Sequence, residues 1–174
     1  SREGQAGEAR GLYRLAIPDF SESIKGAPDF PKSWNYRGLV KYKLGDHAGA
    51  LQDLGRALEL DAGYVKALNN RSKVWLELKE YEKAAEDNRQ ALRYQPSFPQ
   101  AYNDLGIALY MLGRDREAVE SLTRALELDP RLYEAWYNRS VLRERMGDRE
   151  GAARDMEQAQ AVKATVPSGE KLDF

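Results

Sequence analysis

The chain has 174 residues, a formal net charge of -1 and no cysteine. This charge provides no broad basic field, so we expect neither nucleic acid binding nor membrane insertion. The lack of cysteine excludes disulfides, thiolate metal sites and a cysteine nucleophile. No apolar run approaches the roughly 18 residues that a bilayer span requires. We therefore expect a soluble protein, and we favour the cytoplasm over the periplasm or secretion.

One residue pattern recurs along most of the chain with a period of 34. Large apolar residues mark one column of this repeat, at Trp34, Leu68, Tyr102 and Trp136. Columns of alanine begin at Ala50 and Ala57 and keep the same interval through four units. A fixed period of this length, with apolar residues at helical spacing, is typical of a solenoid built from helix-turn-helix units.

The predicted helices follow in chain order as one pair per unit. Residues 1–30 form a partial first unit, in which Gly11 and Ala16 align with later columns and the helix before Gly11 is short. The complete pairs are expected at 31–44 and 46–60, 65–78 and 80–94, 99–112 and 114–128, and 133–146 and 148–163.

Turn residues and small residues support these boundaries. The turn inside a pair carries glycine in three units, at Gly45, Gly113 and Gly147. Glycine suits the left-handed cap that ends such a helix, although the second unit has Lys79 there. The alanine columns let the two helices approach closely, because a longer side chain would clash. Pro96 and Pro130 are expected to end the second helix of their units.

This pattern resembles the tetratricopeptide repeat, and the resemblance covers nearly the whole chain. It is strongest in AYNDLGIALYMLGRDREAVESLTRALELDP and looser in the fourth unit, where Arg143 replaces the usual aromatic or aliphatic residue. The resemblance implies an all-α fold, a right-handed α-solenoid of antiparallel helix pairs, over residues 1–166. Its complete repeats would be 31–64, 65–98, 99–132 and 133–166, after a partial repeat at 1–30 and before a tail at 167–174.

An arginine and an aspartate vary together between units. The pairs are Arg37 with Asp53, Arg71 with Asp87, and Arg139 with Asp155, whereas the third unit has Leu105 and Ser121. Because arginine presents a planar fork to a carboxylate, we interpret these pairs as structural ion pairs that brace the two helices of a unit. The alternative is that the arginines bind a ligand.

In the tetratricopeptide family, the first helix of each unit lines a concave groove. Carried over by position, the resemblance implies a peptide-binding groove lined by Lys32, Asn35, Tyr36, Lys66, Asn69, Asn70, Lys73, Gln100, Asn103, Asp104, Tyr110, Tyr137 and Asn138. Helix propensity does not explain the repeated asparagines. Their amides could hold the backbone of an extended peptide, and alanine there should then leave the melting temperature nearly unchanged. The alternative is a solvated surface that keeps the groove soluble.

The expected groove is basic in its first half and acidic in its second. The first half carries Lys32, Lys43, Lys66 and Lys73 against Glu77. The second half carries Asp104, Glu134 and Glu144 against Arg145. We therefore expect the lysines to favour an acidic stretch of a partner, with an ordinary solvated charged face as the alternative.

Two specialised functions lack support in the sequence. Family members that hold the C-terminal carboxylate of heat-shock chaperones carry a set of Lys, Asn and Arg residues, of which Asn70 and Asn138 match only one. His47 is the single histidine, and there is no HExxH motif, paired metal-ligand spacing or glycine-rich phosphate loop. We therefore expect no chaperone-tail binding, no enzyme activity, no cofactor and no metal.

Two functions stay open at this point. The first is a protein–protein interaction module that binds a peptide or an extended partner segment in the concave groove. The second is a structural or self-assembling scaffold that acts through end-to-end or convex-face contacts. Because the short first helix caps the N-terminal end poorly, that end is the expected surface of a homo-oligomer.

Overall fold

The computed structural model describes residues 2–165, with side chains from residue 10 onward, and every regular element within this range is a helix. The helices are α1 (Arg2–Gly26), α2 (Pro31–Lys43), α3 (His47–Leu60), α4 (Val65–Glu77), α5 (Tyr81–Tyr94), α6 (Pro99–Met111), α7 (Asp115–Leu128), α8 (Tyr133–Arg145) and α9 (Arg149–Thr165). From α2 onward, they begin and end close to the boundaries that the repeat predicts. The expected tail at 167–174 lies outside the described residues.

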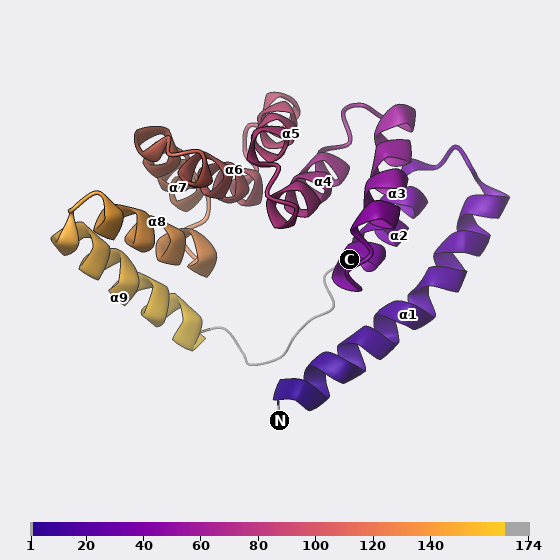
Figure 1. Cartoon of the computed structure of the whole chain (residues 1–174), viewed down its shortest axis with the longest axis horizontal. Coiled ribbons are helices and arrows are strands. Elements are labelled where there is room, and N and C mark those ends of the chain that lie inside the picture. Colours follow the sequence, from indigo (N-terminus) through magenta and orange to yellow (C-terminus); the bar gives the residue numbers. More distant parts are fainter. Residues whose placement is uncertain (1, 166–174) are drawn as a thin grey trace.

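The helices form a solenoid in which each helix packs against the next along the chain. Figure 1 shows them following one another around an open arc, with α1 and α9 at its two ends. Contacts also join α2 to α4, α4 to α6 and α6 to α8, whereas the described parts of α3, α5, α7 and α9 make no such contacts with one another. The first helix of each unit therefore lies on the inner, concave side.

The turn inside each unit has the left-handed backbone that the glycine pattern predicts. Gly45, Gly113 and Gly147 have φ values of 85°, 74° and 84°, and Lys79 adopts the same region with φ of 61°. A left-handed residue with a side chain is strained, because its Cβ approaches the following carbonyl oxygen. The second unit therefore keeps the turn of its neighbours at a conformational cost.

The small residues lie where the two helices of a unit cross. A Cβ at Gly106 would lie 2.7 Å from Leu122 Cγ, and one at Gly38 would lie 2.9 Å from Leu54 Cγ. Both leucines are fully buried, as is Ala118 in the same crossing. The contact is therefore closer than any side chain at the glycine position allows without movement.

The N-terminal unit differs from the helix pair that the alignment predicts. Residues 2–26 form the single helix α1, which runs through Gly11 and Pro18 and packs on α2. The short helix expected before Gly11 is therefore not a separate element, because α1 continues through Gly11. A separate helix before Gly11 would need to pack against its neighbour to be stable. The glycine-rich segment before Gly11 carries little apolar surface for such packing, so no turn interrupts α1 there.

Candidate functional site: the concave face

Polar side chains of neighbouring units bond to one another along the inner face. In each bond, an amide nitrogen donates to an oxygen on the adjacent inner helix. The bonds join Asn35 with Asn70, Asn69 with Asp104, and Asn103 with Asn138, at 2.9, 2.8 and 2.9 Å. The partners are always 35 residues apart, so the same ladder links all three pairs of successive complete units.

The burial of this ladder differs from the sequence-based expectation. Asn35, Asn69 and Asn103 have exposed fractions of only 1%, 3% and 6%. The amide of Asn69 also donates to Asn88, which is fully buried and donates in turn to Ser72. These three asparagines therefore join units, which argues against the expectation that alanine at these positions leaves the melting temperature nearly unchanged. Burial requires such partners, because an unpaired buried amide is costly.

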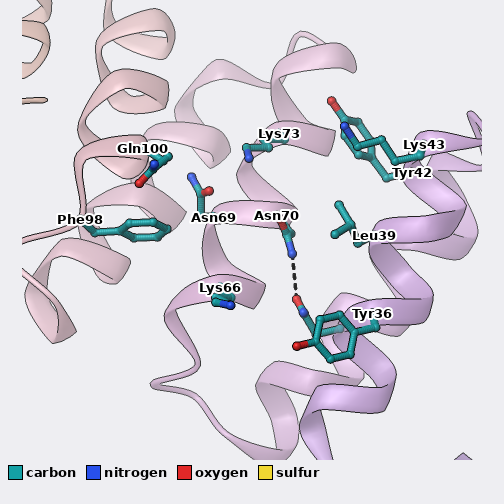
Figure 2. Close-up of a pocket in the computed structure, with 11 residues that line it drawn as sticks. Tyr36, Leu39, Tyr42, Lys43, Lys66, Asn69, Asn70, Lys73, Phe98 and Gln100 are labelled. Carbon is teal, nitrogen blue, oxygen red and sulfur yellow. Dashed lines mark hydrogen bonds between the residues drawn. The ribbon is translucent and has the colours of Figure 1, made fainter. Parts of the chain in front are cut away.

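A pocket between α2, α4 and α6 forms the first hollow of the concave face (Figure 2). We call it the basic compartment, and its lining residues are Asn35, Tyr36, Leu39, Tyr42, Lys43, Lys66, Asn69, Asn70, Lys73, Phe98 and Gln100. Figure 2 shows Phe98 and Gln100 on the side of this space opposite Tyr36. The compartment combines aromatic and aliphatic walls with ammonium and amide groups.

A second pocket lies next to the first, between α4, α6 and α8. We call it the acidic compartment, and its lining residues are Tyr42, Lys73, Leu76, Glu77, Asn103, Asp104, Ile107, Tyr133, Glu134, Tyr137 and Asn138. The rings of Tyr133 and Tyr137 stack there with a centroid distance of 6.2 Å. Tyr42 and Lys73 line both compartments, so the two are continuous.

Burial raises the pKa of two groups that lie between the compartments. Desolvation raises the pKa of the Asp104 carboxyl, while the nearby Lys73 ammonium and the amides of Asn69 and Asn103 act in the opposite direction. Desolvation also raises the pKa of the Tyr42 hydroxyl, which donates to Glu77 at 2.7 Å. Both groups therefore hold their protons more tightly than they would in water.

Each of the three Arg–Asp pairs joins the two helices of its unit. The shortest separations are 2.7 Å for Arg37–Asp53, 2.6 Å for Arg71–Asp87 and 2.8 Å for Arg139–Asp155. Two nitrogens of each guanidinium donate to the two carboxylate oxygens, and in the first pair this bonding raises the pKa of the arginine. The pairs lie away from both compartments, as braces within units.

Two of the braces contain a second cation that the sequence pattern did not reveal. Lys41 lies 2.8 Å from Asp53, and Arg143 lies 3.0 Å from Asp155. Lys41 and Arg143 occupy the same column of the repeat, so comparing the units by column could have found this contact. Arg143, which departs from the family pattern, therefore serves the brace of the fourth unit.

Several other residues also depart from the expected groove. Lys32 lies 6.0 Å from the centre of the Phe30 ring, and Tyr110 lies beneath the guanidinium of Arg145. Neither Lys32 nor Tyr110 lines a compartment. Sequence reasoning did not assign Phe98, Leu76 or Tyr133 to the groove. Phe98 precedes Pro99 at the start of α6, and only the packing of α4 beside α6 brings it to the basic compartment.

The described residues contain no cluster of three or more His, Cys, Asp or Glu side chains that could hold a metal ion. Within the same range, no helix is long and apolar enough to cross a bilayer. The polar side chains that line the two compartments are amides, phenols, ammonium groups and carboxylates.

Family models match most of the chain. Models described as tetratricopeptide repeat match residues 31–64, 99–132 and 133–165, and a model described as TPR repeat matches residues 73–113. The chain belongs to the tetratricopeptide repeat family. Its 34-residue units, glycine turns and inner-helix groove are those of a tetratricopeptide repeat solenoid.

Solved structures of other tetratricopeptide repeat proteins share the fold. MamA 41-end from Desulfovibrio magneticus RS-1 has 19% identity and a TM-score of 0.76, over 94% of this chain and 97% of its own. TTC0263, a thermophilic TPR protein in Thermus thermophilus, has 22% identity and a TM-score of 0.78, over 94% and 90%. The first TPR of Spaghetti (RPAP3), bound to the HSP90 peptide SRMEEVD, has 23% identity and a TM-score of 0.66, over 68% and 94%. No curated protein matches the chain.

Proposed function

We propose that this chain is a non-catalytic protein–protein interaction module that binds an extended partner segment on its concave face. The observation that carries the proposal is the pair of continuous compartments on the inner helices, which share Tyr42 and Lys73. One extended segment can pass through both. Their mixture of apolar walls and a few polar groups is typical of binding sites, and a peptide bound to the Spaghetti (RPAP3) domain supports this class of partner.

In this proposal, the more accessible side-chain amides of the groove form the hydrogen bonds to the partner backbone. Asn70 and Asn138 are half-buried, and each uses its amide nitrogen in the inter-unit ladder. Among the described residues, no donor is bonded to the side-chain oxygen of either. These oxygens can accept from peptide N–H groups, and the exposed amide of Gln100 can both donate and accept. The buried asparagines then hold the groove in shape.

A matched pair of tryptophan substitutions tests the site. Gln100 is exposed and lines the basic compartment, so Gln100→Trp fills that space without changing charge. Gln158 is exposed on the outer helix α9, so Gln158→Trp adds the same bulk outside the groove. Affinity capture with each purified chain, followed by titration of the captured partner, should show loss of binding for Gln100→Trp only. Equal binding by all three chains would remove the groove from the proposal.

A second candidate, self-assembly through the N-terminal end, is favoured by one feature of α1. Leu12 and Leu15 have exposed fractions of 51% and 72% and lie three residues apart on the same helix. Exposed leucines on a terminal helix can pack against the same surface of a second copy of the chain. Sedimentation should then show concentration-dependent oligomers that dissociate in Leu12→Ser/Leu15→Ser. A chain that stays monomeric at all concentrations would count against assembly.

A further inference from the structure

Side chains of opposite charge separate along the concave face. In the basic compartment, the ammonium groups of Lys43, Lys66 and Lys73 come from two helices, α2 and α4, and surround the space that Figure 2 shows. None of the three forms an ion pair with any described residue. Lys43 lies over the ring of Tyr42, at 5.9 Å from its centre. Lys43 and Lys66 therefore face the hollow without a carboxylate partner, whereas the ammonium of Lys73 lies near the buried Asp104.

In the acidic compartment, Glu77 accepts from Tyr42 and lies 2.9 Å from His47, and the buried Asp104 accepts from Asn69 and Asn103. Glu134 is the carboxylate of this lining that remains available. Arg145 pairs with Asp115 and packs 3.7 Å over the ring of Tyr110, both of which lie outside the lining, and the cation within the lining is Lys73. Glu134 is exposed and forms no ion pair with the part of the chain that the structure describes. Tyr137, with an exposed fraction of 44%, lines the same hollow. A carboxylate beside an open aromatic ring suits a cation.

We propose that the occupant of the groove is an extended peptide segment whose charges follow a fixed order. An Asp or Glu of the segment lies in the basic compartment, and a Lys or Arg lies in the acidic compartment. This inference rests on the proposed function and specifies its partner. Neighbouring helices lie about 8–10 Å apart, and an extended chain advances about 3.3–3.6 Å per residue. The two charges are therefore separated by about three residues.

Charge order selects the partner and the direction in which its chain runs. A segment with the opposite order, bound in the same chain direction, would place its carboxylate beside Glu134 and its cation beside Lys66. Such like-charge contacts reject a ligand more strongly than the favourable contacts retain it, because attraction across an interface is offset by desolvation. The ordered pair therefore gives specificity that the apolar walls and amides alone do not provide.

Selection from a displayed library of random peptides, each of about 12 residues, tests the charge order with the full chain as bait. Selected peptides are synthesised in the original form and with their acidic and basic residues exchanged, and binding is measured by fluorescence anisotropy. We expect one charge order among the selected peptides, and exchange should weaken binding at least about tenfold. Selected peptides that bind equally well after exchange would overturn the inference.

Charge reversals in the protein give the matching measurement. Lys66→Glu/Lys73→Glu should lower the affinity for the selected peptides at least about tenfold, and this loss of affinity should be smaller at high salt. Glu134→Lys should lower the affinity for the same peptides about threefold or more. Arg56→Glu/Arg154→Glu changes the net charge by the same amount at exposed sites on α3 and α9, and it should alter affinity less than about twofold. Circular dichroism checks that each variant is folded.

The outcomes separate this inference from the proposed function. Peptides that lose affinity for Gln100→Trp but bind the lysine reversal normally would keep the groove as the site and overturn the charge order. If no peptide is selected, or if the selected peptides bind Gln100→Trp normally, both the groove and the charge order are overturned. Weaker binding to Gln100→Trp and to the lysine reversal, with no effect of the control, supports both.

Discussion

At the helix crossing in the third complete unit, adding one methyl group by Gly106→Ala tests how closely the two helices pack, through its effect on the free energy of unfolding. A Cβ at Gly106 would lie 2.7 Å from Leu122 Cγ and 3.0 Å from Leu122 Cδ2, in a fully buried contact. Gly55, within helix α3, has no heavy atom within 4 Å of the corresponding position. Gly106→Ala and Gly55→Ala therefore make the same chemical change in a closed and an open place.

The difference between the two variants isolates the cost of overpacking. Both gain helix propensity of about 0.5–1 kcal/mol, since alanine loses less backbone entropy than glycine. Only Gly106→Ala forces Leu122 to move, which costs about 1–3 kcal/mol. We therefore expect Gly55→Ala to be stabilised by about 0.5–1 kcal/mol and Gly106→Ala to be about 1–3 kcal/mol less stable than Gly55→Ala.

Urea denaturation followed by circular dichroism measures this difference. In a Leu122→Ala background, the same Gly106→Ala change should lose most of its cost, because, of the three atoms nearest the new Cβ, only the Ala118 carbonyl oxygen, at 3.3 Å, remains. If Gly106→Ala stabilises the chain as much as Gly55→Ala does, the close approach of α6 and α7 does not exist in solution. Destabilisation that persists without Leu122 would assign the cost to another contact.

Further predictions concern the brace, the turn and the ladder. Asp155→Ala leaves the buried guanidinium of Arg139 without its main partner and should cost about 3–5 kcal/mol in urea denaturation, so a loss below about 1 kcal/mol would refute a buried brace. Lys79→Gly should raise the free energy of unfolding by about 1 kcal/mol, because glycine relieves the strain at φ of 61°; an unchanged melting temperature would show that no strain is stored there. Asn69→Ala should cost about 1–3 kcal/mol, because it removes a donor from the buried Asp104; a melting temperature like that of the wild type would return Asn69 to the groove surface. Since burial raises the pKa of Asp104, its native form binds protons more tightly than the unfolded form, and its contribution to stability falls as pH rises above the ordinary value of 3.8. The stability of Asp104→Asn relative to wild type should therefore be greater at about pH 8 than at about pH 3, and a difference that is equal at these two pH values would contradict the shift.

The positions of the helices after residue 30 followed from local chemistry. Apolar residues at helical spacing, glycine at the turns and the fixed period act within one unit, and each unit repeats the same choice. The spacing of Arg71 and Asp87 likewise falls within one helix pair, whose geometry the family resemblance supplies. Interactions of this kind could be expected without coordinates.

The roles of the inner asparagines depended on the neighbouring units. The sequence places Asn69 on the inner face of α4, and tertiary packing sets that face against Asp104 of α6 and Asn88 of α5. A helical pattern indicates which face a residue occupies and leaves open which residue of another helix lies opposite it. That partner depends on the rotation and distance between units, which the whole set of packed side chains determines.

For the charges of the concave face as well, the sequence predicted their positions and tertiary packing decided their partners. The sequence by itself determined that lysines predominate in the first half and carboxylates in the second, since both follow from repeat position. Only the tertiary structure decided which charges are available, because Arg145 is held by Asp115, 30 residues away on another helix, while Lys66 meets no such partner among the described residues. Ion pairs between helices depend on side-chain distances of a few ångströms, and those distances are set by folding rather than by position in a repeat.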